Sequence, residues 1–129
     1  MVLEYSLNKA LEEFSVSIRE FTVAPHVSQD QNRSCHEWFI EFDKAPESLA
    51  AFSNCIDLHL RKKNVYYDDL IKGNILGPLQ IIPVQKGGFV DYMRSIGKLG
   101  GQNKVPRLSN DRKIADALTS FTQNNTAHS

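Results

Sequence analysis

Hydrophobic residues in the first half of the chain follow first a helical and then an extended period. The helical face begins after Ser6, a candidate N-cap, and consists of Leu7, Ala10, Leu11 and Phe14. Residues 16–24 are rich in β-formers and predict a strand that Pro25 closes. The alternation over residues 35–42 predicts the clearest strand, with Trp38, Ile40 and Phe42 on one face and Glu37, Phe39 and Glu41 on the other.

The second half returns to a helical period and contains one further strand. A helix is expected from Pro46 to about Lys63, where Asn64 ends it, and residues 65–72 predict a short helix or turn. Residues 79–84 predict a strand whose Pro83 favours a sheet edge. Two more helices are expected from apolar stripes. The first stripe is Phe89, Tyr92, Met93 and Ile96. The second is Ile114, Ala117 and Leu118, and Ser109 or Asn110 is expected to cap its helix.

This order of elements predicts an α+β fold. We expect a small sheet of about three strands with helices packed mainly on one face. The length of 129 residues suits one domain, which we place at residues 1–121. Residues 122–129 are polar and are expected to form a disordered tail.

The overall charge and the absence of a long apolar run argue against binding to nucleic acid and to membranes. Lys plus Arg equals Asp plus Glu at 15 each, so the formal net charge is zero. A dedicated nucleic-acid binder usually carries a basic excess, so nucleic acid is not an expected partner. No apolar run reaches the roughly 20 residues of a spanning helix, so we expect no membrane association and a cytoplasmic location.

The two cysteines do not predict a metal site. Cys35 is followed directly by His36, and Cys55 is followed four residues later by His59, which is only half of a zinc ligand set. We therefore expect buried, reduced thiols and no metal site. His36 shares a strand face with Trp38 and is interpreted as a packed core histidine.

The segment 97–112 differs from the rest of the chain in composition. Its sixteen residues, GKLGGQNKVPRLSNDR, contain three glycines, one acid and four cations, Lys98, Lys104, Arg107 and Arg112. Glycines permit close approach of a ligand, and the cations suit phosphate or carboxylate oxygens. The alternative is a solvated basic loop tied to nearby acids. Standard nucleotide-binding and hydrolase motifs are absent, so a self-contained active site is not expected.

At this segment the sequence resembles the auxin-responsive acyl acid–amido synthetase (Gretchen Hagen) family, especially its bacterial branch. The whole segment is similar to that branch's C-terminal signature, and Gln102-x-Lys104-x-Pro106-Arg107 resembles the Q-x-K-T-P-R stretch of plant members. His36-Glu37-Trp38 resembles the family's H-E-W strand. The resemblance extends over roughly residues 1–120. Tyr67-Asp68 keeps an aromatic–acid pair of the family, but Leu70-Ile71 stands where related bacterial sequences carry charges.

The resemblance implies a two-domain, adenylate-forming ligase of which this chain is the C-terminal domain. An N-terminal adenylating domain of the same polypeptide would bind ATP, Mg²⁺ and a carboxylic acid. The acid would be converted to an acyl-adenylate and then attacked by an amine such as an amino acid. The chain alone is expected to be inactive and to hold no cofactor.

Carried over by position, the resemblance assigns Lys104 as the catalytic lysine during adenylation. A cation there would stabilise negative charge that develops as the carboxylate attacks the α-phosphate. The expected nucleotide or phosphate contacts are Lys98, Gly100, Gly101, Gln102 and Arg107. For Lys98 a helix-end cation is the competing interpretation.

Two other interpretations of the basic segment remain open. The first is a small α+β module that binds RNA or another anion through this loop, although strand motifs combining aromatic and basic residues are missing. The second is a domain that docks onto another protein.

Overall fold

A computed structural model of the chain describes residues 2–26, 34–97, 108 and 112–122. Its elements, in chain order, are α1 (Val2–Glu13), β1 (Ser17–His26), β2 (Cys35–Lys44), α2 (Leu49–Lys63), α3 (Val65–Lys72), β3 (Gln80–Val84), α4 (Gly88–Ser95), α5 (Lys113–Leu118) and a 3₁₀ turn, η1 (Thr119–Phe121). Residues 123–129 of the predicted tail lie outside the described part, so that prediction stays open.

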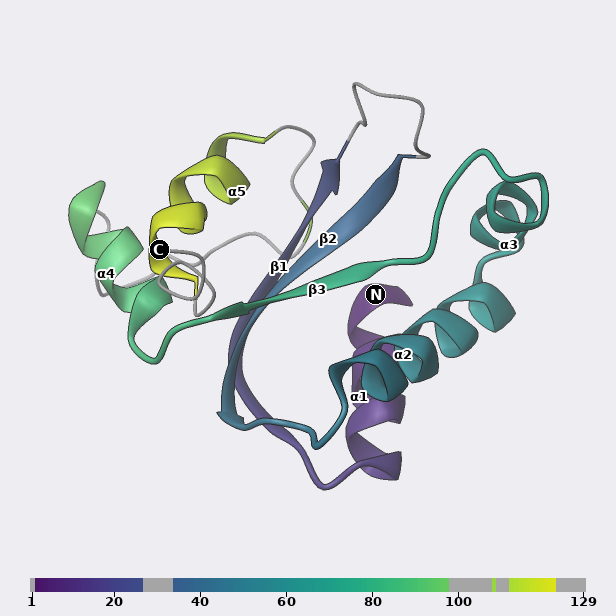
Figure 1. Cartoon of the computed structure of the whole chain (residues 1–129), viewed down its shortest axis with the longest axis horizontal. Coiled ribbons are helices and arrows are strands. Elements are labelled where there is room, and N and C mark those ends of the chain that lie inside the picture. Colours follow the sequence, from purple (N-terminus) through teal and green to yellow (C-terminus); the bar gives the residue numbers. More distant parts are fainter. Residues whose placement is uncertain (1, 27–33, 98–107, 109–111, 123–129) are drawn as a thin grey trace.

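The three strands form one mixed sheet in the order β1-β2-β3, which confirms the predicted α+β class (Figure 1). β1 and β2 are antiparallel, with Phe21 opposite Ile40. β2 and β3 are parallel, with Ile40 opposite Pro83. Pro83 therefore lies on an edge strand, as its missing N–H predicts.

One face of the sheet is covered by α1, α2 and α3, which include the two longest helices. The even positions of β2 point into this layer, where Phe21 stacks on Trp38 with ring centroids 5.8 Å apart. Phe52 of α2 makes edge contacts with Phe14 and Phe42. The predicted apolar face of β2 is therefore the core of the three-helix layer.

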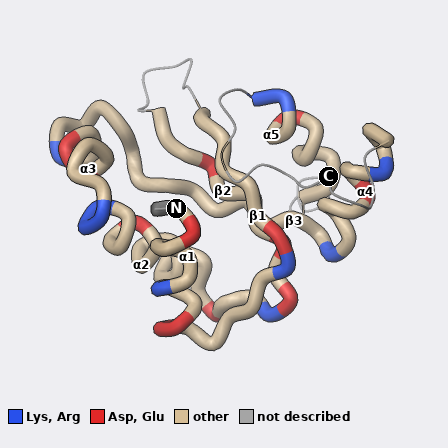
Figure 2. Tube along the Cα trace, turned by 180° about the vertical axis from the view of Figure 1, so that it is seen from behind, with Lys and Arg blue, Asp and Glu red and all other residues tan. Residues whose placement is uncertain are grey.

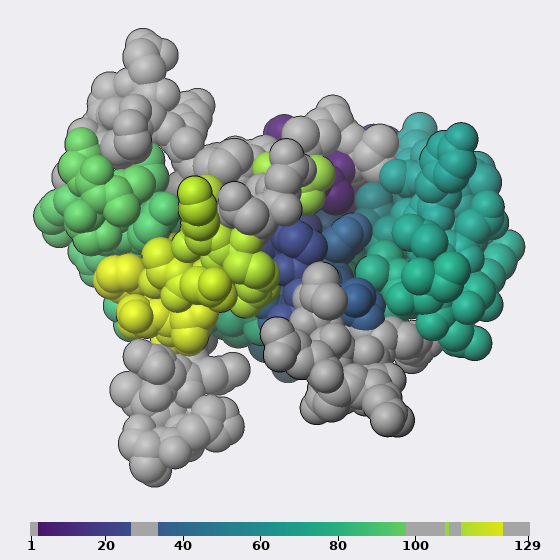
Figure 3. Space-filling view, turned by 90° about the horizontal axis from the view of Figure 1, so that it is seen from above, coloured from purple at the N-terminus to yellow at the C-terminus, as the bar shows by residue number. Residues whose placement is uncertain are grey.

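The opposite face is covered by the shorter α4 and α5. Phe39 and Val84 of the sheet pack there against Phe89, Tyr92 and Leu118. Figure 3 shows these helices, in green and yellow, separated by the blue strands from the teal segment that contains α2 and α3. The helices thus lie mainly on one face of the sheet. The second face is also covered, so that its side chains Phe39 and Val84 are buried.

Three helix starts differ from the predictions, and one of them is that of α5, which begins at Lys113 with Arg112 at its N-cap position instead of Ser109 or Asn110. α1 begins at Val2, so Ser6 lies within the helix and is fully buried instead of capping it. α2 begins at Leu49, because the Ser48 hydroxyl accepts a hydrogen bond from the Ala51 N–H at 3.1 Å and caps the helix after Pro46. Asn64 does end α2, and its side chain also caps α3 by accepting from the Tyr67 N–H.

Charged residues of both signs are distributed along the described part of the chain. In the view of Figure 2, acids and bases are interspersed along the helices and strand ends and do not form a face of one sign. This agrees with the zero formal net charge of the sequence. Within the described ranges, no helix combines the length and apolar character that crossing a bilayer demands.

Candidate functional site

All six predicted site residues lie outside the described part of the chain: Lys98, Gly100, Gly101, Gln102, Lys104 and Arg107. Their prediction is therefore neither confirmed nor contradicted by the geometry. The structure does describe the residues at both ends of this segment, and these determine where the segment leaves and rejoins the domain.

The segment begins at Gly97, directly after α4. Gly97 has φ 72°, in the left-handed region that glycine adopts without steric cost, and its N–H donates to the Arg94 carbonyl at 3.1 Å. This geometry ends α4 and redirects the chain. The position of the segment's first end is therefore set by α4.

The start of α4 is held by a buried carboxylate from the sheet. Glu41 of β2 is 1% exposed, and its oxygens accept from the N–H groups of Gly87 at 2.9 Å and Phe89 at 3.3 Å. The Arg19 guanidinium lies 3.7 Å from the same carboxylate. A negative charge at a helix N-terminus is favourable, so Glu41 fixes α4 on the sheet and thereby the origin of the segment.

The segment rejoins the domain at the outer edge of β1. Leu108 forms a parallel bridge with Val23. Arg112 donates to Glu37 Oε1 at 2.5 Å and to the Pro25 carbonyl at 3.2 Å. Both acceptors belong to the sheet, so this end is anchored to β1 and β2.

Arg112 is the one cation of the predicted basic segment that the structure describes. Besides its bonds to the sheet, it lies 3.3 Å from the Asp116 carboxylate one turn along α5. With its guanidinium engaged in this way, Arg112 fits the alternative of a cation tied to nearby acids. We assign it an anchoring role and not a phosphate contact.

Of residues 66–69, Tyr67 and Asp68 take part in the packing of α3 on α2, whereas Tyr66 and Asp69 are exposed. The Tyr67 hydroxyl donates to Asp57 Oδ1 at 2.5 Å. Asp68 is paired with Arg61 at 2.6 Å and Lys72 at 3.0 Å, and the Arg61 hydrogen bond is the main reason that its pKa is lowered. The contacts with Asp57 and Arg61 join α3 to α2, whereas the pair with Lys72 lies within α3.

His36 is a packed histidine, as predicted from its strand face. Its ring stacks on Tyr67 with centroids 5.8 Å apart and planes 16° apart. Burial lowers the pKa of His36, which favours the neutral ring at physiological pH. A packing role accounts for these observations.

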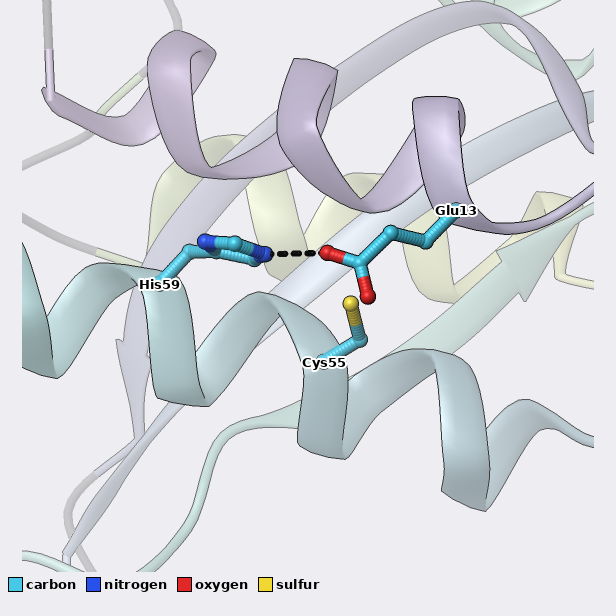
Figure 4. Close-up of side chains that lie close together, drawn as sticks. All are labelled: Glu13, Cys55 and His59. Atoms are coloured by element: carbon cyan, nitrogen blue, oxygen red, sulfur yellow. Dashed lines mark hydrogen bonds and ion pairs between the residues drawn. The ribbon is translucent and has the colours of Figure 1, made fainter.

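A cluster that the sequence did not predict lies between α1 and α2. Glu13, the last residue of α1, points toward Cys55 and His59 of α2 (Figure 4). His59 Nε2 and Glu13 Oε2 are 2.6 Å apart, and one ligand-type atom from each of the three residues lies within 4.8 Å of the others. The Cys55–His59 spacing was visible in the sequence, but nothing local indicated that Glu13, 46 residues before His59, would join them.

The electrostatics of this cluster keep the cysteine protonated. Burial, followed by the charge of the Glu13 carboxylate and its hydrogen bond with the thiol, raises the pKa of Cys55. The hydrogen bond with His59 lowers the pKa of Glu13, which favours the carboxylate. The group is thus a thiol and an imidazole that both contact one carboxylate.

Access to the cluster is from the side of Glu13. The Glu13 side chain is 55% exposed and that of His59 is 19% exposed, whereas Cys55 is buried. Glu13 also lines an open groove of about 500 Å³ between the α1–β1 and β2–α2 connections. A small ion or a water molecule can therefore reach the carboxylate side without movement of the helices.

Two comparisons with known proteins found matches. The family model described as the GH3 family C-terminal domain matches residues 2–113. A solved structure titled "GH3.15 acyl acid amido synthetase" is similar at 19% identity with a TM-score of 0.72, and one titled "AtGH3.15 acyl acid amido synthetase in complex with 2,4-DB" at 18% with 0.70. Each similarity covers 93% of this chain but only 23% of the other chain. No curated protein matches the sequence.

Proposed function

The chain belongs to the GH3 family, whose C-terminal domain it matches, and we propose that it forms the C-terminal domain of an ATP-dependent acyl acid–amido synthetase. In this proposal the enzyme converts a carboxylic acid to an acyl-adenylate and conjugates it to an amine such as an amino acid. The observation that carries the proposal is the family match over residues 2–113, which runs through the whole basic segment 97–112. The shared fold with the two synthetase structures supports it.

The proposed partner is an N-terminal adenylating domain in the same polypeptide. The chain spans about a quarter of the length of the structures that it resembles, which leaves room for a larger domain in an enzyme of this kind. ATP, Mg²⁺ and the acid would be held mainly by that domain. The assignment to the bacterial branch and the cytoplasmic location remain predictions.

Lys104 is the residue to which we assign a catalytic role in adenylation. As the carboxylate attacks the α-phosphate, two anionic groups are brought together and negative charge builds on the phosphate oxygens. A lysine ammonium placed near these oxygens stabilises that charge more in the transition state than in the ground state. Lys98, Gly100, Gly101, Gln102 and Arg107 are the proposed phosphate or nucleotide contacts beside it.

The described anchors support this role by fixing both ends of the segment. Glu41 and Gly97 define its origin at α4, and Arg112 holds its other end to Glu37 on the sheet. Fixed ends reduce the conformational freedom that is lost when a loop residue meets its ligand. The family match favours this interpretation over an anion-binding module for RNA.

The test is a Lys104→Ala substitution in the full-length enzyme. Pyrophosphate release on addition of acid and ATP is expected to fall by about 100-fold or more, because one charge-stabilising donor is removed. Amide formation from a preformed acyl-adenylate should change much less, since in that step the amine attacks the acyl carbon, whereas Lys104 is assigned to the attack on the α-phosphate.

Lys44→Ala is the matched control, because Lys44 is an exposed lysine at the end of β2 and is not part of the basic segment 97–112. It should leave both steps unchanged. Undiminished pyrophosphate release in Lys104→Ala would remove this lysine from the mechanism.

A further inference from the structure

We propose that Glu13, Cys55 and His59 form a binding site for a divalent cation of the zinc class, which joins the end of α1 to α2. This site is independent of the proposed synthetase reaction. Its three residues belong to the helices α1 and α2 and not to the basic segment 97–112.

The backbone places the three donors for a common ligand. Cys55 and His59 are four residues apart on α2, so their side chains lie one above the other on one side of that helix. Glu13 reaches the same point from α1, which packs against α2. One donor atom from each residue lies within 4.8 Å of the other two.

These separations are close to those around a bound ion. Zinc–ligand bonds of about 2.0–2.3 Å in a tetrahedral site put neighbouring donor atoms about 3.3–3.8 Å apart. The His59–Glu13 pair at 2.6 Å would open slightly, and the wider separations would close. Side-chain rotations are sufficient for both changes, since Glu13 is a half-exposed residue at a helix end.

The chemical mixture of donors selects the class of ion. A thiolate, an imidazole and a carboxylate are the three ligand types of zinc in proteins, whereas Mg²⁺ and Ca²⁺ prefer oxygen alone. Three protein ligands leave one tetrahedral position, and the exposure of Glu13 allows a water molecule to fill it. On binding, a Zn–S bond replaces the S–H bond of Cys55 and that proton passes to solvent.

The experiment is a zinc titration of the metal-free chain by calorimetry, repeated with cobalt(II) by absorption spectroscopy. We expect one ion per chain and a thiolate-to-cobalt charge-transfer band. Cys55→Ser should weaken zinc binding by more than about 100-fold and abolish the band, because ligand loss exceeds the 10- to 100-fold effects of outer contacts. Glu13→Gln should weaken binding by at least about 10-fold.

Cys35→Ser is the matched control. Cys35 is also a free cysteine, but within the described ranges it does not belong to a group of three potential metal ligands, whereas Cys55 does. This variant should keep both the stoichiometry and the band. Circular dichroism would establish that each variant is folded, and Glu13→Gln, at an exposed position, tests the site if Cys55→Ser does not fold. Absence of binding at micromolar zinc, or equal binding by the native chain and both site variants, would overturn the proposal.

Discussion

Tyr67 and Asp57 form a polar pair within the three-helix layer. The two residues are 5% and 8% exposed, and the tyrosine hydroxyl donates to the carboxylate at 2.5 Å. Burial, and then the hydrogen bond to Asp57, raise the pKa of Tyr67 far above its ordinary value. The hydroxyl therefore stays protonated and available as a donor throughout the physiological pH range.

Tyr67→Phe is expected to lower the free energy of unfolding by about 1–3 kcal/mol, because it leaves the Asp57 carboxylate buried without this donor. Urea unfolding followed by circular dichroism would measure the change. Tyr66→Phe is the matched control on the same helix, since Tyr66 is 82% exposed, and it should change stability by less than about 0.5 kcal/mol. Equal effects of the two substitutions would contradict a role for the buried hydrogen bond.

At the scale of elements, α4 depends on a residue from the sheet. Gly87 precedes the helix with φ 82° and has no side chain with which to cap it. Glu41 accepts from its first N–H groups instead, across 46 residues of sequence. A residue of β2 therefore helps to orient the helix that leads into the basic segment.

Glu41→Gln is expected to lower the free energy of unfolding by about 1–3 kcal/mol. The amide keeps the volume, but it removes the charge that favours the helix N-terminus and turns one acceptor oxygen into a donor that faces N–H groups. Denaturant unfolding would give the overall change, and hydrogen exchange would show lower protection in α4. Glu47→Gln, at an exposed position before α2, should have little effect on either measurement. An unchanged stability in Glu41→Gln would show that α4 needs no cap from the sheet.

At the scale of the molecule, β2 separates two hydrophobic layers of unequal size. Trp38 and Ile40 face the larger layer with α1, α2 and α3, and Phe39 faces the smaller one with α4 and α5. Less apolar surface is buried by α4 and α5, so less free energy opposes their opening.

Native-state hydrogen exchange at increasing denaturant would test this division. Amides of Phe39 and Ile40 should exchange only through global unfolding, because they lie in the central strand. Amides of α4 and α5 should exchange through an opening of lower free energy that leaves α1, α2 and α3 protected. A single free energy for all three groups would mean that the two layers unfold together.

Much of the element order was predictable, because it depends on local chemistry. The alternation in residues 35–42 predicts β2, Asn64 ends α2 as its position indicates, and Pro83 does lie on an edge strand. The starts of α1 and α2 were predicted less well. Ser6 lies within α1 instead of capping it, and α2 begins after Ser48 instead of at Pro46, because the Ser48 hydroxyl accepts from a helical N–H.

The sequence by itself determined the period of each segment, the α+β class and the unusual composition of residues 97–112. Only the tertiary structure decided which distant side chains meet. It buries Glu41 under α4, pairs Arg112 with Glu37, and brings Glu13 to Cys55 and His59. The physical reason is that helix and strand periods arise from neighbouring residues, whereas these contacts depend on how whole elements pack on the sheet.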